Sequence, residues 1–221
     1  MPSAAKTLRR DALRNRERLL AAARAAFAED GVDASLEEVA RRAGVGIGTL
    51  YRHFPAREAL VEAIVDEKLA AWLAAAEHAA ARKDAWRGLQ DYLAQLVELQ
   101  LEHRALRDVL VEHSGAEGRL EPVRERVREL LDNLIRRAHD DGSLRRDFTS
   151  ADLTVLGWSL GRVIEATADV APRAVYRHLH FALDGMRPRA ATRQVEGPLD
   201  REQLVRALRT SRARRFPRRS P

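Results

Sequence analysis

Apolar residues recur along most of the chain at intervals of three and four positions, which places them on one face of an α-helix. In the first such segment, at about residues 11–29, Leu13, Leu20, Ala23 and Phe27 are predicted to face inward. Strand-forming residues are sparse, whereas alanine, leucine, arginine and glutamate, which favour helices, dominate. The sequence therefore predicts an all-α protein.

Two short helices are predicted directly after the first one, in a stretch rich in glycine. Ser35 is suited to cap a helix at about residues 36–43, and Glu38, three residues later, completes the pattern of a capping box. Gly44 is expected to end this helix, because glycine adopts the left-handed conformation without a Cβ penalty. A second short helix is expected at about residues 47–53.

The rest of the chain is predicted to form longer helices joined by loops that contain glycine, proline and aspartate. A long helix begins near Ala56 and connects the short helices to everything after them. The later helices are expected at residues 85–102, 104–113, 122–140, 150–167 and 172–186. From residue 188 the helical pattern breaks, and the arginine- and proline-rich end is predicted to be largely disordered.

Length and composition describe a globular protein on the charged side of the usual range. The chain has 221 residues, of which 45% are hydrophobic and 33% charged. No apolar run approaches the roughly 20 residues that span a bilayer, and the charged N-terminus lacks the apolar core of a signal peptide. These features predict a cytoplasmic protein without a membrane partner.

The net charge of +6 comes from the C-terminal end of the chain. From Arg187 onward there are eleven arginines and three acidic residues, whereas the preceding 186 residues carry 28 basic and 30 acidic ones. The overall basicity is therefore no evidence for a nucleic-acid-binding domain, which has to be argued from local placement. The arginine-rich end is either a solvated tail or an additional source of non-specific attraction to phosphates.

The two short helices and the tight turn between them fit a helix-turn-helix, whose second helix enters the major groove of DNA. Small residues such as Ala43 would let the helices approach closely, and Val45, Leu50 and Phe54 would fill the space between them. The segment from Ser35 to Val65, SLEEVARRAGVGIGTLYRHFPAREALVEAIV, resembles the TetR family of transcriptional regulators.

The resemblance implies an architecture and a function. It implies a helix-turn-helix DNA-binding domain at residues 10–56, a helical effector-binding and dimerisation domain at residues 57–187, and a basic tail at residues 188–221. A homodimer would repress transcription by binding double-stranded operator DNA, and a small-molecule effector would release it by tilting the fourth helix. An activator of the same fold and a helical protein-interaction module remain as alternatives, and the sequence names neither effector nor operator.

The family pattern assigns DNA contacts to positions around the second short helix. They are Ser35, Gly46, Ile47, Gly48, Thr49, Tyr51, Arg52, His53 and Arg57. Two of them depart from the pattern, since Gly46 replaces a common serine cap and Ile47 replaces a residue that is often polar. An isoleucine cannot bond guanine but can contact a thymine methyl group. The alternatives are that Tyr51 is a core aromatic and His53 a solvated surface group.

In the second domain, one set of positions is a candidate for effector binding and another for dimerisation. The alternative for both sets is that these residues only form the hydrophobic core. The effector candidates combine bulky apolar and a few polar side chains, as small-molecule pockets do: Trp86, Tyr92, Leu96, Gln100, His103, Leu110, Trp158 and Arg162. An inward Arg162 would favour an acidic effector, although it is also spaced to pair with Glu165. The dimerisation candidates would form a four-helix bundle across a two-fold axis: Leu153, Leu156, Leu160, Val163, Ile164, Val175, Leu179, Leu183 and Met186.

Neither catalysis nor metal binding is indicated by the sequence. The chain has no cysteine, its seven histidines are scattered, and His178 and His180 lie on different helix faces because they are two positions apart. No nucleophile–base pair, carboxylate pair or phosphate-binding loop is recognisable. We therefore expect no enzymatic activity, no metal, and no cofactor besides an unidentified small-molecule effector.

Overall fold

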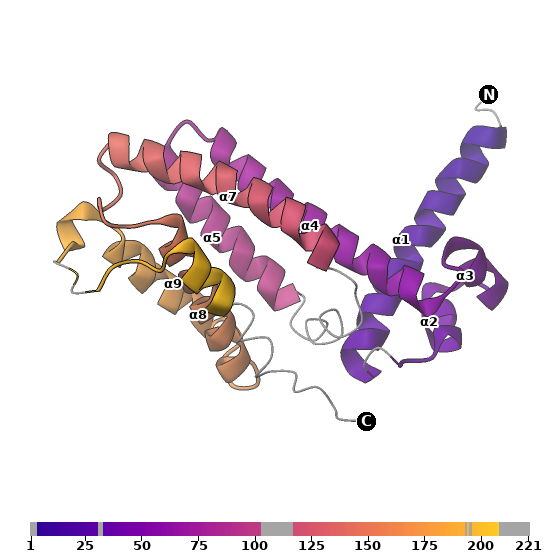
Figure 1. Ribbon diagram of the computed structural model, residues 1–221. Helices are drawn as coiled ribbons and strands as arrows, with labels where there is room; N and C mark the ends of the chain where they lie inside the picture. The colour runs from indigo at the N-terminus through magenta and orange to yellow at the C-terminus, as the bar shows by residue number, and fades with distance from the viewer. Residues whose placement is uncertain (1–3, 31–32, 103–116, 193, 195, 208–221) are drawn as a thin grey trace. The chain divides into compact units, whose positions relative to one another are not determined.

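The computed structural model describes residues 4–30, 33–102, 117–192, 194 and 196–207, and Figure 1 shows the course of the chain. All regular structure in these ranges is helical, which confirms the all-α prediction. In chain order the helices are α1 (Ala4–Asp30), α2 (Leu36–Ala43), α3 (Ile47–His53), α4 (Arg57–Ala81), α5 (Ala85–Glu102), α7 (Glu117–Asp140), α8 (Ser150–Thr167) and α9 (Ala174–Gly185). A 3₁₀ turn at Pro188–Ala190 and a short helix at residues 201–207 follow.

Four helices, α2, α3, α5 and α8, occupy the ranges predicted for them. The start predicted for α7 is wrong, because the helix begins at Glu117 and contains Pro122. Pro122 is the sixth residue of α7, where proline removes one hydrogen bond to the preceding turn and its ring crowds the carbonyl four residues earlier. The helix predicted at residues 104–113 lies outside the described residues.

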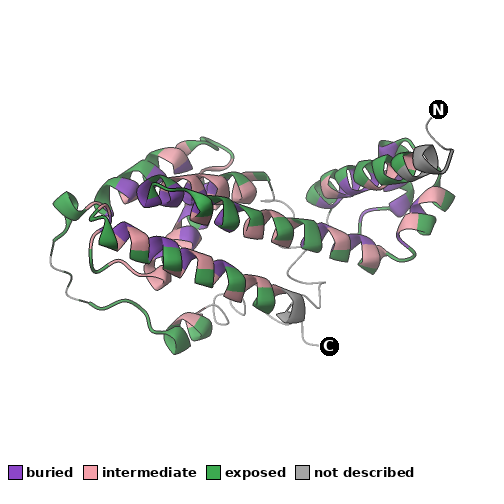
Figure 2. Cartoon of the chain, turned by 90° about the horizontal axis from the view of Figure 1, so that it is seen from above, coloured by how far each residue is buried: buried purple, intermediate pink, exposed green. Residues whose placement is uncertain are grey.

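The chain divides into two compact units within α4. The first unit comprises residues 1–70 with 103–120, and the second comprises residues 71–102 with 121–221. Each unit has its own hydrophobic core, and the buried positions of its helices form the purple faces in Figure 2. Helix α4 contributes buried side chains to both cores, so it belongs to both units. The domain limits expected from the sequence therefore stay predictions.

The core of the first unit joins α1, α2, α3 and the beginning of α4. Phe27, Leu50, Phe54, Leu60 and Ile64 are each at most 2% exposed in it. Burying a large apolar side chain stabilises a fold by roughly 1.5–3 kcal/mol, so this cluster fixes α3, which has only seven residues. One predicted core residue is wrong, because Leu13 is 63% exposed.

The second unit is built from the end of α4 together with α5, α7, α8 and α9. Helix α5 approaches its neighbours closely at Gly88, where an added Cβ would lie 2.6 Å from the Ala79 carbonyl oxygen and 2.9 Å from Leu134 Cδ1. Within this core the Trp72 indole N–H donates to the Tyr92 hydroxyl at 3.1 Å. Burial raises the pKa of Tyr92, and the bond from Trp72 opposes that rise.

Candidate nucleic-acid interface

Ser35 fixes the N-terminus of α2. Its hydroxyl oxygen accepts a hydrogen bond from the Glu38 backbone N–H at 3.3 Å, as predicted, and the hydroxyl donates to the Glu37 carboxylate at 2.7 Å. The second half of the predicted capping box is wrong, because the Glu38 carboxylate accepts from Arg41 and Arg42 instead. Hydrogen bonds between two charged groups are stronger than a bond to one backbone N–H, so the arginines hold this carboxylate.

The turn between α2 and α3 depends on two glycines. Gly44 has a φ of 65° and a left-handed conformation, and its N–H closes the end of α2 on the carbonyls of Ala40 and Arg41. Gly46 is extended and caps α3 without a side-chain bond, while its carbonyl oxygen accepts from the N–H groups of Thr49 and Leu50. The predicted end of α2 and the predicted start of α3 are therefore confirmed.

Helix α3 has a buried face and an open face. Leu50 is completely buried, and Phe54, directly after the helix, is 2% exposed. On the outer side Ile47 is 37% and Tyr51 46% exposed, which rules out the alternative that Tyr51 is a core aromatic. No heavy atom of the described chain lies within 4 Å of a Cβ added at Gly46 or Gly48, so the backbone is also accessible there.

The polar side chains around α3 differ in how firmly they are held. Arg52 is exposed and donates to the carbonyl oxygen of Gly48 and to the Thr49 hydroxyl, both at 3.3 Å. Arg57 is half-buried and donates to the Ala34 carbonyl oxygen at 2.5 Å, which ties the start of α4 to the segment before α2. Arg57 thus has a structural bond in addition to its predicted role toward DNA.

Several arginines of the first unit are engaged by carboxylates. Arg42 bridges Glu29 and Glu38 at 2.8 and 2.7 Å, and Arg41 holds Glu38 as well. The hydrogen bonds from Arg41 and then Arg42 lower the pKa of Glu38 from 4.5 to about 2. The guanidinium groups of Arg41 and Arg42 are therefore engaged by carboxylates at the surface of the first unit.

The arginines nearest to α3 lack such partners. In the described part of the chain no carboxylate pairs with Arg16 or Arg18. The Arg18 guanidinium lies beside the turn, 2.5 Å from the position of an added Cβ on Gly44. The Arg16 guanidinium lies over the Phe54 ring, with its Cζ atom 4.6 Å from the ring centroid.

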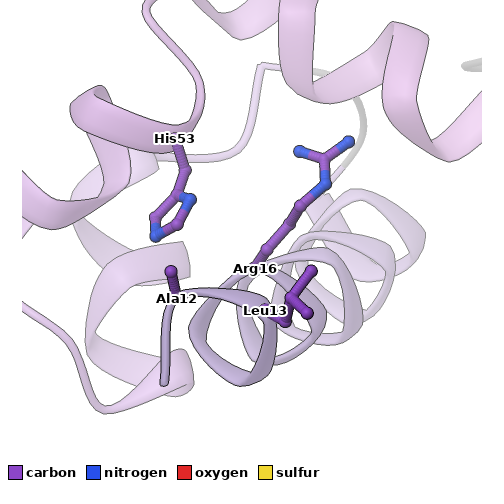
Figure 3. A pocket seen from close by; sticks show the side chains of 4 residues that line it. All are labelled: Ala12, Leu13, Arg16 and His53. Carbon is purple, nitrogen blue, oxygen red and sulfur yellow. The ribbon is translucent and has the colours of Figure 1, made fainter. Parts of the chain in front are cut away.

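A hollow of about 390 Å³ opens between α1 and the last turn of α3. It is lined by Ala12, Leu13, Arg16 and His53, and Figure 3 shows the Arg16 and His53 side chains on either side of it. Sequence reasoning named His53 but missed Arg16. No feature of the sequence shows that the ring of Phe54 lies beneath Arg16.

Metal binding and membrane insertion find no support in the described ranges. They contain no group of three or more histidine and acidic side chains that could hold a metal ion. None of their helices combines the length and the apolarity needed to cross a bilayer.

Comparison with known proteins relates two parts of the chain to bacterial transcriptional regulators. Residues 19–64 match the model of the bacterial regulatory proteins of the tetR family, and residues 84–188 match the C-terminal domain of SbtR-like transcriptional regulators. A TetR transcriptional regulator from Streptomyces coelicolor is 32% identical, with 78% of this chain and 98% of that one covered at a TM-score of 0.60. The chain belongs to the TetR family of transcriptional regulators.

Other TetR-family and helix-turn-helix relatives agree with this assignment. The TetR regulator from Mycobacterium vanbaalenii is 30% identical, with 81% of this chain and 99% of that one covered at a TM-score of 0.62. A helix-turn-helix-type transcriptional regulator from Staphylococcus aureus is 32% identical over 104 residues, which are 45% of this chain and 55% of that one. The chain thus matches little more than half the length of this curated relative.

The predicted effector positions of this TetR-family chain fall into different environments. Trp86 and Tyr92 are buried, Leu96 and Trp158 are half-buried, and Gln100 donates to the Gly157 carbonyl oxygen at 3.3 Å. The inward orientation considered for Arg162 is wrong, because its side chain is 74% exposed and pairs with Glu165. The remaining two positions lie outside the described residues: His103 and Leu110.

A cavity of about 700 Å³ in the second unit involves none of these effector candidates. Phe148, Leu156 and Met186 form its apolar wall, and Arg145 and Asp152 are among its polar residues. Gln194 and residues 196–198, all in the described part of the chain, cover one side. Elsewhere in the core, the buried Trp86 indole N–H has no hydrogen-bond partner among the described residues. The Arg187 guanidinium stacks on the Trp86 ring, with Cζ 3.9 Å from the ring centroid.

Most of the dimerisation positions predicted for this TetR-family chain are buried in the core of their own chain. Side chains that are 6% exposed or less have almost no surface left to bury against a second copy, and this group comprises Leu153, Leu160, Ile164, Val175, Leu179, Leu183 and Met186. Leu156 and Val163 are half-buried and pack against the same core. The strongest apolar stripe of each helix closes the core of its own chain, as the alternative held.

Proposed function

We propose that this chain is a homodimeric repressor that binds operator DNA through α3 and is released by a small-molecule effector. The observation that carries the proposal is the open outer face of α3. There Ile47 and Tyr51 are exposed and two glycines leave the backbone accessible, while Leu50 and Phe54 anchor the helix from inside. Membership of the TetR family supports the same assignment.

In this proposal α3 enters the major groove with its N-terminal end toward the bases. Ile47 would contact a thymine methyl group, so specificity at that base pair would rest on shape and apolar contact. Thr49, Tyr51 and His53 would bind phosphates beside the groove and set the orientation of the helix. The other proposed contacts are Ser35, Gly46, Gly48, Arg52 and Arg57.

The dimer would form through the outer faces of α8 and α9. Val155 on α8 is 39% exposed and Phe181 on α9 is 59% exposed, with the Arg177 guanidinium over the Phe181 ring. A two-fold axis would bring the same apolar patch of a second copy against them and form a four-helix arrangement. These positions replace the buried ones expected from the sequence.

Helix α4 is the element through which an effector would act. It supplies Leu60 and Ile64 to the core of the first unit and Ala76 and Ala79 to that of the second. A ligand that displaces the second half of α4 therefore acts on residues that anchor the DNA-binding unit, because one continuous helix carries both sets. We propose that the effector lies among Trp86, Tyr92, Leu96, Gln100 and Trp158.

Two further parts of the proposal follow from a role in transcription. A regulator of bacterial genes acts where the chromosome lies, so we place the protein in the cytoplasm. We also propose that it has no enzymatic activity, since its function needs only binding equilibria. A transcriptional activator with the same DNA-binding surface is the second candidate, because α3 would bind DNA in the same way whether transcription is repressed or activated.

The test is selection of bound fragments from sheared genomic DNA, followed by titration of the purified chain against the enriched sequence. We expect sequence-selective binding, with half-sites about one helical turn apart, roughly 34–36 Å. Transcription from the bound promoter should rise when the gene for this protein is deleted. A fall in transcription would identify an activator, and the absence of any selected sequence would refute the DNA-binding role.

A further inference from the structure

The hollow between α1 and α3 has the chemistry of an anion-binding site. Two of its four lining residues, Arg16 and His53, are basic or able to donate a hydrogen bond, and the other two, Ala12 and Leu13, are apolar. None of the described residues that line it is acidic. The hollow of about 390 Å³ is large enough to admit a phosphate group together with part of a sugar.

Arg16 is held in place on the wall of this hollow. Its guanidinium stacks on Phe54, which is 2% exposed and belongs to the core of the first unit. The same ring lies beside His53, with 6.4 Å between the two ring centroids. One buried aromatic therefore positions both polar groups, so little side-chain freedom would be lost when they bind a ligand.

Arg16 differs from two other arginines of α1, which pair with carboxylates. Arg14 pairs with Asp11 at 3.5 Å and Arg24 pairs with Glu67 at 2.5 Å. Arg16 has no carboxylate partner among the described residues. A guanidinium that stacks on an aromatic ring keeps its N–H groups free for an anion, and its fork of donors matches the oxygens of a phosphate.

We propose that Arg16 and His53 together bind one phosphate of the operator backbone in this hollow. The proposal rests on the DNA-binding function proposed above. When the N-terminal end of α3 lies in the major groove, the backbone flanking the groove passes the other end of the helix, where His53 and the hollow lie. Leu13, 63% exposed on the rim, provides an apolar contact for the adjoining deoxyribose.

The experiment compares Arg16→Gln with the control Arg14→Gln, in the full-length chain on the selected operator. Each replacement removes one positive charge from α1, but Arg14 does not line the hollow. For Arg16→Gln we expect affinity to fall about tenfold and the salt dependence of log K to weaken by about 0.9 per lost phosphate contact, or about 1.8 per dimer. Arg14→Gln should keep the wild-type slope.

A scan with single neutral methylphosphonates along the operator identifies the phosphate. The wild-type protein should lose affinity at one position in each half-site, and Arg16→Gln and His53→Gln should each be insensitive at that same position. Thermal unfolding of each variant separates a folding defect from a lost contact, and Arg16→Lys retains the charge if Arg16→Gln does not fold.

Equal salt slopes for the two arginine variants, or unchanged sensitivity at every phosphate in Arg16→Gln, would overturn the inference while leaving the DNA-binding function intact. Failure of the wild-type protein to select any DNA sequence would overturn both.

Discussion

Adjacent residues of α3 have opposite environments. Leu50 is completely buried among the helices of the first unit, whereas Tyr51, the next residue, is 46% exposed. Leu50 stabilises the fold, while the phenol ring and hydroxyl group of Tyr51 are accessible to a partner. Substitutions at the two positions should therefore have different consequences.

Replacing Tyr51 by alanine should weaken operator binding without affecting folding. A hydrogen bond to a charged group contributes roughly 1.5–3 kcal/mol, so we expect a loss of about tenfold or more in affinity. Fluorescence anisotropy with labelled operator measures this loss, and a thermal melt within about 2 °C of wild type would show that the fold is intact. Tyr51→Phe isolates the hydroxyl group, and wild-type affinity in both variants would contradict the proposed contact.

Glu38 should titrate far below an ordinary glutamate. Its hydrogen bonds with Arg41 and Arg42 lower its pKa from 4.5 to about 2. Because the pKa is depressed by folding, the stabilisation is present above pH 4.5 and is lost as the pH falls toward about 2. Carboxyl-carbon NMR should show this midpoint, and Arg41→Gln should move it upward toward 4.5. An unshifted midpoint in the wild-type protein would exclude the network in solution.

The residues that could be predicted were those governed by local rules. Gly44 and Ser35 were assigned from turn and capping chemistry, which depends on neighbours within a few positions. Leu13 was misplaced and Arg16 was missed, because their environments depend on how far α1 extends beyond the helices it covers and on the position of Phe54. Those contacts are long-range and leave no periodic trace in the sequence.

At the scale of elements, one especially close contact between helices occurs at a glycine. The backbone of α5 lies so near α4 at Gly88 that a methyl group there would clash with the carbonyl oxygen of Ala79 and with Leu134. A backbone carbonyl cannot turn away as a flexible side chain can. The packing of the second unit thus depends on one missing side chain.

Gly88→Ala should destabilise the protein even though alanine is the better helix former. Overpacking of this kind costs roughly 1–3 kcal/mol, which exceeds the gain of about 1 kcal/mol in helix propensity. Urea denaturation should give a lower free energy of unfolding. Gly185→Ala is the matched control, since no described atom lies within 4 Å of its added Cβ. A more stable Gly88→Ala variant would show that the helices separate easily.

Helix boundaries were predictable where a cap or a glycine marks them, as for α2 and α3. The outer faces of α8 and α9 that we propose for dimerisation were not predictable, because the periodicity of a helix identifies its most apolar stripe and that stripe belongs to the core. A second copy would be recognised by a weaker and more mixed pattern. Only the exposure of the side chains in the structure distinguishes the outer face of each helix from its core-facing stripe.

At the scale of the whole molecule, dimerisation is the property that the operator requires. A protein with one DNA-binding unit contacts one half-site, whereas two units related by symmetry contact both. Phe181 and Val155 are the exposed apolar side chains of the described parts of α8 and α9 on which that symmetry would be built.

The double variant Val155→Glu and Phe181→Glu should be monomeric at micromolar concentration, because pairing the two faces would bury four carboxylates. Analytical ultracentrifugation measures the change, and circular dichroism should remain that of the wild type. Val170→Glu, at a position 84% exposed in the loop between the two helices, is the control and should stay dimeric. A double variant that remains a dimer would place the interface elsewhere.

The family and the all-helical fold could be predicted, the family from the resemblance of residues 35–65. An effector could not be named, because a pocket for a small molecule is specified by the shape between helices and no sequence motif records it. The buried, unpartnered N–H of Trp86 became apparent only from the structure.

The open surface at Gly46, Ile47 and Gly48 has a consequence for how such a protein changes over time. A Cβ added at either glycine meets no described atom within 4 Å, and Ile47 is 37% exposed. We expect substitutions at the two glycines to cost little stability, so changes at these proposed contact positions would alter the operator preference while the fold persists. A combinatorial library at these three codons would therefore consist mostly of folded members, and new target sequences could be obtained from it by selection alone.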